Sequence, residues 1–88
     1  MSEDERRTAA IYNFYDVYRE LQKYDSLRMH LHTELGGETL IEIYRYQGEV
    51  KGSRILRVTQ DDEVEAYEQA ADEVKNMLEK IKKDRKAG

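Results

Sequence analysis

Apolar residues recur at helical spacing in the first part of the chain. Steps of four and three residues alternate through Ala10, Phe14, Val17, Leu21 and Tyr24. This spacing places the side chains along one stripe of an amphipathic helix. Ser2 precedes the segment as a candidate N-cap, and the acidic residues after it lie at the positive end of the helix dipole. The pattern predicts a helix over residues 3–24.

A second apolar stripe follows the same rule near the C-terminus. It runs through Val64, Tyr67, Ala71, Val74, Leu78 and Ile81. Seven acidic residues lie between positions 61 and 73, and six basic residues lie between positions 75 and 86. This order of charge complements the dipole of a helix. We expect a helix over residues 61–84, with Thr59 or Asp61 as its N-cap and a frayed tail after Asp84.

Polar and apolar residues alternate in the middle of the chain, as in β-strands that bury one face. The alternation and the β-forming residues predict strands over residues 27–35, 39–46 and 53–59. The third strand begins as early as Val50 if its apolar side chain is included. Glycines at 36, 37, 48 and 52 mark the turns between the strands. Three consecutive strands with short connections predict an antiparallel meander.

The loop between the first two strands sets their register. A two-residue loop at Gly36 and Gly37 pairs Leu31 with Glu42, which brings carboxylates into the buried row. A three-residue loop over 36–38 pairs Leu31 with Ile43 and Thr33 with Ile41, which keeps charge out of the core. We therefore expect the three-residue loop.

This register defines an apolar inner face of the sheet, which both amphipathic helices are expected to cover. The residues on this face are Leu27, Met29, Leu31, Leu35, Ile41, Ile43, Leu56 and Val58. The predicted fold is a single α+β domain over residues 1–88, a two-layer sandwich in the order α-β-β-β-α. Its sheet is a three-stranded antiparallel meander, with both helices packed on one face.

Composition narrows the classes of function. The 88 residues contain no Cys, so disulfide scaffolds, thiolate metal sites and Cys nucleophiles are excluded. Apolar runs reach four residues at most, and we expect no membrane span and a cytoplasmic location. The net charge of −4 argues against broad, charge-driven binding of nucleic acid.

The outer face of the predicted sheet is the first candidate interaction surface. Its candidate partner-binding residues are Arg28, His30, His32, Tyr44, Tyr46, Ile55 and Arg57. Tyr and Arg are enriched where protein interfaces concentrate their binding energy. We expect this face to bind a protein partner or a second copy of the chain as a homodimer. An ordinary solvated sheet face is the competing interpretation.

The sequence predicts neither a metal nor a catalytic centre. His30 and His32 point outward together, and the expected register sets Glu42 opposite His32. A structural zinc site normally takes four protein ligands, so we expect a His32–Glu42 cross-strand pair instead. Neither a nucleophile elbow nor a glycine-rich phosphate loop is present. We therefore expect a non-enzymatic domain without a cofactor.

The order of the elements resembles that of double-stranded RNA-binding domains. In that family, a lysine cluster at the start of the second helix grips phosphates. The matching segment here reads Asp61-Asp62-Glu63-Val64-Glu65, so the resemblance implies no RNA binding.

Two alternative functions remain open. The acidic helix start, with Asp61, Asp62, Glu63 and Glu65, suits an inhibitor of the kind that phages and mobile elements encode. Such an inhibitor would imitate nucleic acid and block a basic groove. The tyrosines and arginines of the outer face also suit binding of single-stranded nucleic acid.

Overall fold

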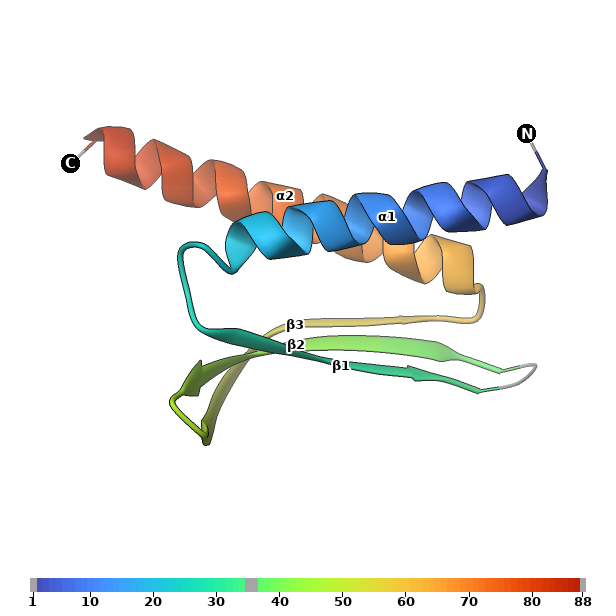
Figure 1. The fold of residues 1–88 in the computed structure, drawn as a ribbon, viewed down its shortest axis with the longest axis horizontal. Coiled ribbons are helices and arrows are strands. Elements are labelled where there is room, and N and C mark those ends of the chain that lie inside the picture. Colours follow the sequence, from blue (N-terminus) through green and yellow to red (C-terminus); the bar gives the residue numbers. More distant parts are fainter. Residues whose placement is uncertain (1, 35–36, 88) are drawn as a thin grey trace.

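Two helices and a three-stranded sheet form the chain in the order α-β-β-β-α (Figure 1). The computed structural model describes residues 2–34 and 37–87. The elements are α1 (Glu3–Leu21), β1 (Leu27–Thr33), β2 (Thr39–Gln47), β3 (Val50–Gln60) and α2 (Glu63–Ala87). The strands are antiparallel in the order β1-β2-β3, and both helices lie on one side of the sheet. The predicted α+β sandwich is confirmed.

Helix α1 begins where the sequence predicts. The side chain of Ser2 accepts a hydrogen bond from the backbone N–H of Glu5 at 3.2 Å. The helix ends at Leu21, three residues before the predicted end. The backbone N–H of Tyr24 donates to the carbonyl of Leu21, which tightens the chain into a turn. Tyr24 nevertheless packs against the core, which explains why it continues the apolar stripe.

Helix α2 is capped by Asp62, so the predicted caps Thr59 and Asp61 are wrong. The carboxylate of Asp62 accepts from the backbone N–H of Val64 at 2.8 Å, and its carbonyl accepts from Ala66. Thr59 cannot serve because β3 continues through Gln60. At the other end, the tail expected to fray after Asp84 continues as helix through Ala87.

The core lies between the helix layer and the inner face of the sheet. Phe14 and Val74 are fully buried from the helices, as are Ile41 and Ile43 from β2. Small residues on α2, such as Ala70, bring the two helices close together. Burial raises the pKa of Tyr18 and of Tyr67, because the charged phenolate is disfavoured among apolar groups.

The register of β1 against β2 differs from the predicted one by two residues. Leu31 pairs with Ile41, and Thr33 pairs with Thr39. A shift of two leaves every side chain on its predicted face, because the side-chain period of a strand is two. The predicted loop over 36–38 and the predicted core residue Leu35 fall partly or wholly outside the described residues. Leu31 lies on an edge strand and is 36% exposed, so the helices cover this end of the inner face incompletely.

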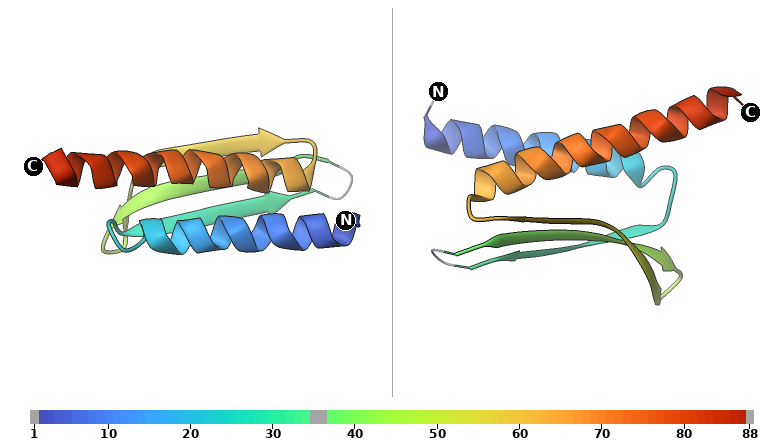
Figure 2. Two further views of the ribbon diagram at one scale, coloured as in Figure 1. Left: turned by 90° about the horizontal axis from the view of Figure 1, so that it is seen from above. Right: turned by 180° about the vertical axis from the view of Figure 1, so that it is seen from behind.

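Two irregularities bend the β2–β3 hairpin. Ile43 pairs with Leu56 but Tyr44 pairs with Arg54, which leaves Ile55 as an extra residue in β3. The second irregularity lies near Gly52, where an added Cβ would meet the carbonyl oxygen of Arg45 at 2.7 Å. Bulges of this kind increase twist and bend a strand. The end of the hairpin accordingly curls away from the helices (Figures 1 and 2).

Candidate interaction surface

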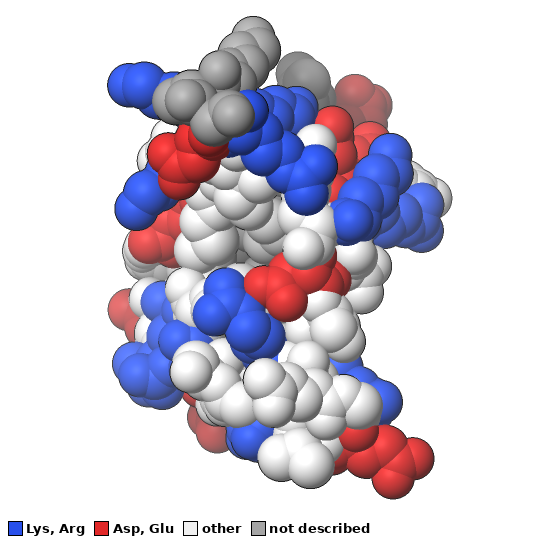
Figure 3. Space-filling view, turned by 90° about the vertical axis from the view of Figure 1, so that its left-hand side faces the viewer, with Lys and Arg blue, Asp and Glu red and all other residues white. Residues whose placement is uncertain are grey.

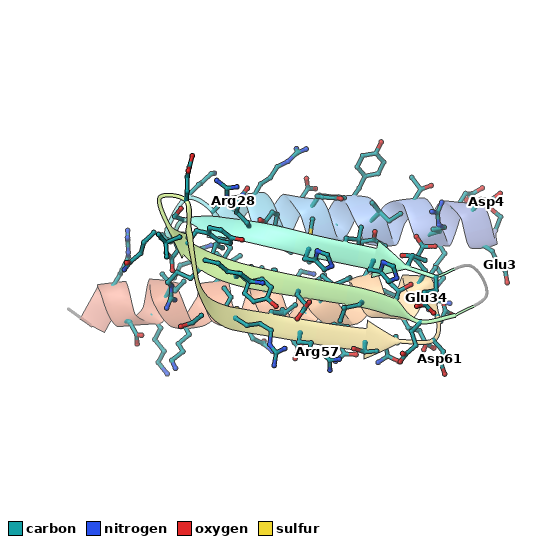
Figure 4. The ribbon with its side chains drawn as sticks, turned by 90° about the horizontal axis from the view of Figure 1, so that it is seen from below. Glu3, Asp4, Arg28, Glu34, Arg57 and Asp61 are labelled. Atoms are coloured by element: carbon teal, nitrogen blue, oxygen red, sulfur yellow. The ribbon has the colours of Figure 1, made fainter. Side chains whose placement is uncertain are left out.

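The outer sheet face is the side of the sheet that points away from both helices. We define it by the outward strand residues Arg28, His30, His32, Leu40, Glu42, Tyr44, Tyr46, Lys51, Arg54, Arg57 and Thr59. Directly opposed residues of antiparallel strands share a face, so the pairing fixes these positions. Figure 4 shows this face toward the viewer, with Arg28 on β1 and Arg57 on β3. Six of the seven predicted partner-binding residues belong to it.

Ile55 is the exception, and its predicted outward position is wrong. The bulge interrupts the alternation, so Ile55 packs against the core on the helix side of the sheet. Arg54 takes the outward position opposite Tyr44, and Lys51 takes the one opposite Tyr46. Neither cation is among the partner-binding residues predicted from the sequence. The adjacent apolar residues Ile55 and Leu56 break the alternating pattern, and this was the available signal for a bulge.

Cations cover the rings of both outer tyrosines. The guanidinium carbon of Arg28 lies 4.9 Å from the centroid of the Tyr46 ring. The ammonium of Lys51 lies 3.9 Å from the centroid of the Tyr44 ring. Such contacts contribute about 0.5–1 kcal/mol at exposed sites. They hold the aromatic and the basic side chains together as one surface.

Glu42 is the single acidic residue within the strands of this face, and its carboxylate is engaged. It accepts hydrogen bonds from the Tyr44 hydroxyl at 2.9 Å and from Arg54 Nη1 at 3.3 Å. The hydrogen bond from Tyr44, followed by the interactions with Arg54, lowers the pKa of Glu42 despite partial desolvation. The carboxylate therefore stays ionised. Four cations (Arg28, Lys51, Arg54 and Arg57) minus one carboxylate leave the strands of this face with a charge of +3.

The histidines do not form the predicted pair. His30, not His32, lies opposite Glu42, because the true register is offset by two residues. His32 lies opposite Leu40, and its Nε2 is 3.6 Å from a carboxylate oxygen of Glu34. Within residues 2–34 and 37–87, no three His, Asp or Glu side chains converge as metal ligands.

The bend of the hairpin hollows the outer sheet face. A depression of about 270 Å³ lies between β1 and the curled end of β2 and β3. The side chains that border it include Arg28, His30, Glu42, Tyr44, Tyr46 and Lys51. The depression therefore combines aromatic walls with basic edges, and a side chain of a partner can enter it.

The acidic start of α2 is partly neutralised by α1. Arg7 donates to both carboxylate oxygens of Glu63, at 3.1 and 3.0 Å. Arg6 donates to Glu68 at 2.8 Å. Asp62 is occupied as the N-cap. Of the four acidic residues singled out in the sequence, Asp61 and Glu65 remain exposed without a partner among the described residues.

Comparison of the chain with protein-family models, curated proteins and solved structures finds no match. Neither described helix has a stretch long and apolar enough to cross a membrane.

Proposed function

We propose that this chain is a non-enzymatic protein-interaction domain whose outer sheet face binds an acidic segment of a protein partner. The observation that carries the proposal is the contrast in charge. The whole chain has a net charge of −4, whereas the strands of the outer sheet face carry +3. Charge complementarity speeds the encounter with an oppositely charged partner and disfavours the binding of partners with the same charge.

The tyrosines favour a protein over single-stranded nucleic acid as the partner. Bases stack on the open faces of aromatic rings. Here Arg28 covers Tyr46 and Lys51 covers Tyr44, so one face of each ring is already occupied. Glu42 also accepts hydrogen bonds from the Tyr44 hydroxyl and from Arg54 of β3, and its carboxylate would repel a phosphate placed over Tyr44. A peptide is compatible with both features, because its acidic side chains can reach the cations at the edges.

The same charge argues against a homodimer through this face. Two copies that met through their outer sheet faces would bring together two sets of outward strand residues of charge +3 each, with Glu34 and Glu38 at one border of each face. Like charges in contact disfavour association. We therefore favour a different protein as the partner.

The structure gives less support than the sequence does to the alternative that the acidic start of α2 imitates nucleic acid. A mimic needs a row of unpaired carboxylates at the surface. Glu63 and Glu68 instead form ion pairs with Arg7 and Arg6. The acids at this end stabilise the contact between the helices and cap α2.

Selection of binding peptides tests the proposal. A library of random peptides is displayed and selected on the wild-type chain and on the double variant Lys51→Gln/Arg57→Gln. The control, Lys75→Gln/Lys83→Gln, removes two exposed cations from α2 instead. We expect the wild type and the control to enrich acidic peptides, and the double variant to lose them. Enrichment of neutral or basic peptides, or equal enrichment by all three proteins, contradicts the proposal.

A further inference from the structure

A second hollow lies on the opposite side of the bent hairpin, at the end of the sandwich where α1 stops. Helix α2 extends past the end of α1, while the hairpin curls away from it (Figure 2). The two layers therefore separate at this end. The space between them measures about 340 Å³ and is open at its mouth. A hollow of this size falls within the range of small-molecule sites, about 300–1,000 Å³.

The wall of this hollow is apolar. Three parts of the chain contribute to it: the connection from α1 to β1, the bulge of β3 and the C-terminal half of α2. Its apolar side chains are Leu21, Tyr24, Leu27, Ile55, Met77 and Ile81. Four of them, namely Tyr24, Ile55, Met77 and Ile81, are only partly buried, so their surface is available to a ligand.

The rim of the hollow is basic. Lys80 and Arg85 of α2 border it, and the described residues place no carboxylate within ion-pair distance of either. Arg85 lies over the ring of Tyr24, at 4.7 Å from its centroid, which holds its charge beside the apolar wall. Arg45 is also on the rim, but it is paired with Asp25 at 2.6 Å. Figure 3 views this end of the molecule and shows uncharged atoms bordered by Lys and Arg and also by Asp and Glu.

We propose that this end hollow binds the alkyl chain of a single-chain amphiphile with an anionic head, in the chemical class of medium-chain fatty acids. The apolar wall takes the chain, and Lys80 and Arg85 take the carboxylate. The hollow of about 340 Å³ has room for an alkyl chain of medium length, and it is open at its mouth, where the head group can reach Lys80 and Arg85. An amphipathic helix needs a longer groove with anchors over several turns.

The end hollow shares no side chain with the outer sheet face, because it lies on the other side of the sheet. Both depend on the same bend of the hairpin. The bulge at Ile55 turns this side chain toward the helices, where it becomes part of the hollow. Ligand binding at the end hollow is therefore separable from partner binding by mutation.

Titration with dodecanoate below its micelle concentration tests the site, with backbone amide chemical shifts as the readout. We expect saturable shifts at Tyr24, Ile55, Met77 and Ile81, and none at His32 and Leu40, which lie at the far end of the outer sheet face. Lys80→Gln/Arg85→Gln should weaken binding about ten-fold, a loss of about 1.4 kcal/mol. The control Lys75→Gln/Lys83→Gln should change it less than about two-fold, as should the outer-face variant Tyr44→Ser/Tyr46→Ser.

Two further ligands separate the contributions of chain and head. Hexanoate should bind at least about ten-fold more weakly, because a shorter chain buries less apolar surface. Dodecyltrimethylammonium has the same chain with a cationic head, and it should also bind at least about ten-fold more weakly. The proposal is overturned if dodecanoate gives no saturable shifts. It is also overturned if the shifts map elsewhere. The same holds if the wild type binds the cationic amphiphile as tightly as dodecanoate, or if Lys80→Gln/Arg85→Gln binds dodecanoate as tightly as the wild type does.

Discussion

Tyr44 lies opposite Arg54, one residue earlier in β3 than uninterrupted alternation would place its partner. This offset decides which side chains reach the outer sheet face. It turns Ile55 toward the helices and brings Arg54 outward beside Tyr44, while the second irregularity near Gly52 sets Lys51 opposite Tyr46. The bend that accompanies it also shapes both hollows of the molecule. The two irregularities therefore link the sequence of β3 to the two surfaces on which binding is proposed.

The inward position of Ile55 predicts a clear cost of a polar substitution. Ile55→Asp places a carboxylate against the core, and we expect the free energy of unfolding to fall by about 2 kcal/mol. Urea denaturation followed by circular dichroism measures the change. Arg57→Ser on the outer sheet face is the control and should stay within about 0.5 kcal/mol. A negligible effect of Ile55→Asp would show that this side chain points to solvent.

Gly52 is required by close approach of the neighbouring strand. A Cβ at this position would lie 2.7 Å from the carbonyl oxygen of Arg45, so Gly52→Ala forces the backbone to move. We expect a loss of about 1–3 kcal/mol in the free energy of unfolding, the usual cost of overpacking. The adjacent Ser53→Ala serves as the control in the same thermal denaturation. Equal melting temperatures for the two variants would argue against the second bulge.

The N-cap of α2 gives a prediction that separates neighbouring aspartates. Asp62→Ala removes the acceptor of the Val64 N–H and should cost about 1 kcal/mol of stability. Asp61→Ala should cost less than about 0.5 kcal/mol, because Asp61 is exposed and has no capping role. Chemical denaturation of both variants measures the difference. A larger loss for Asp61→Ala would place the start of the helix one residue earlier.

The ionised carboxylate of Glu42 should contribute to the stability of the fold in a way that depends on pH. Its pKa is lower in the folded chain than in the unfolded chain, so its contribution is fully present above the unfolded value of about 4.3. The contribution is lost as the pH falls through the folded value. Melting temperatures of the wild type and Glu42→Gln should therefore differ at neutral pH and converge in acid. Glu49→Gln, at the exposed hairpin turn, is the control. A difference in melting temperature between the wild type and Glu42→Gln that grows in acid would contradict the lowered pKa of Glu42.

The element order and the faces of the sheet were predictable because they depend on periodicity. The stripe from Val64 to Ile81 and the alternation from Leu27 onward each repeat often enough to define a face. The register of β1 and β2 was not predictable, because pairing Leu31 with Ile41 or with Ile43 keeps charge equally well out of the core. Only the conformation of the loop distinguishes these two registers.

The residues of the outer sheet face were predictable only where the strands alternate regularly. Tyr44, Tyr46 and Arg28 follow regular alternation, so the sequence placed them correctly. Arg54 lies beyond the first bulge, where parity changes, and Lys51 lies beyond the second, outside the predicted strand over residues 53–59. The ion pairs from Arg6 and Arg7 to α2 join residues far apart in the chain, and no local pattern predicts such contacts.

The most direct test of the central claim is the affinity of one selected acidic peptide for the wild type and for Lys51→Gln/Arg57→Gln. It is measured by calorimetry at about 0.1 M and about 1 M salt, where the screening length falls from about 10 Å to about 3 Å. We predict binding about ten-fold weaker for the variant at low salt, and a smaller gap at high salt, where the exposed cations are screened. Equal affinity of the two proteins at low salt would contradict the assignment of the outer sheet face as the binding surface.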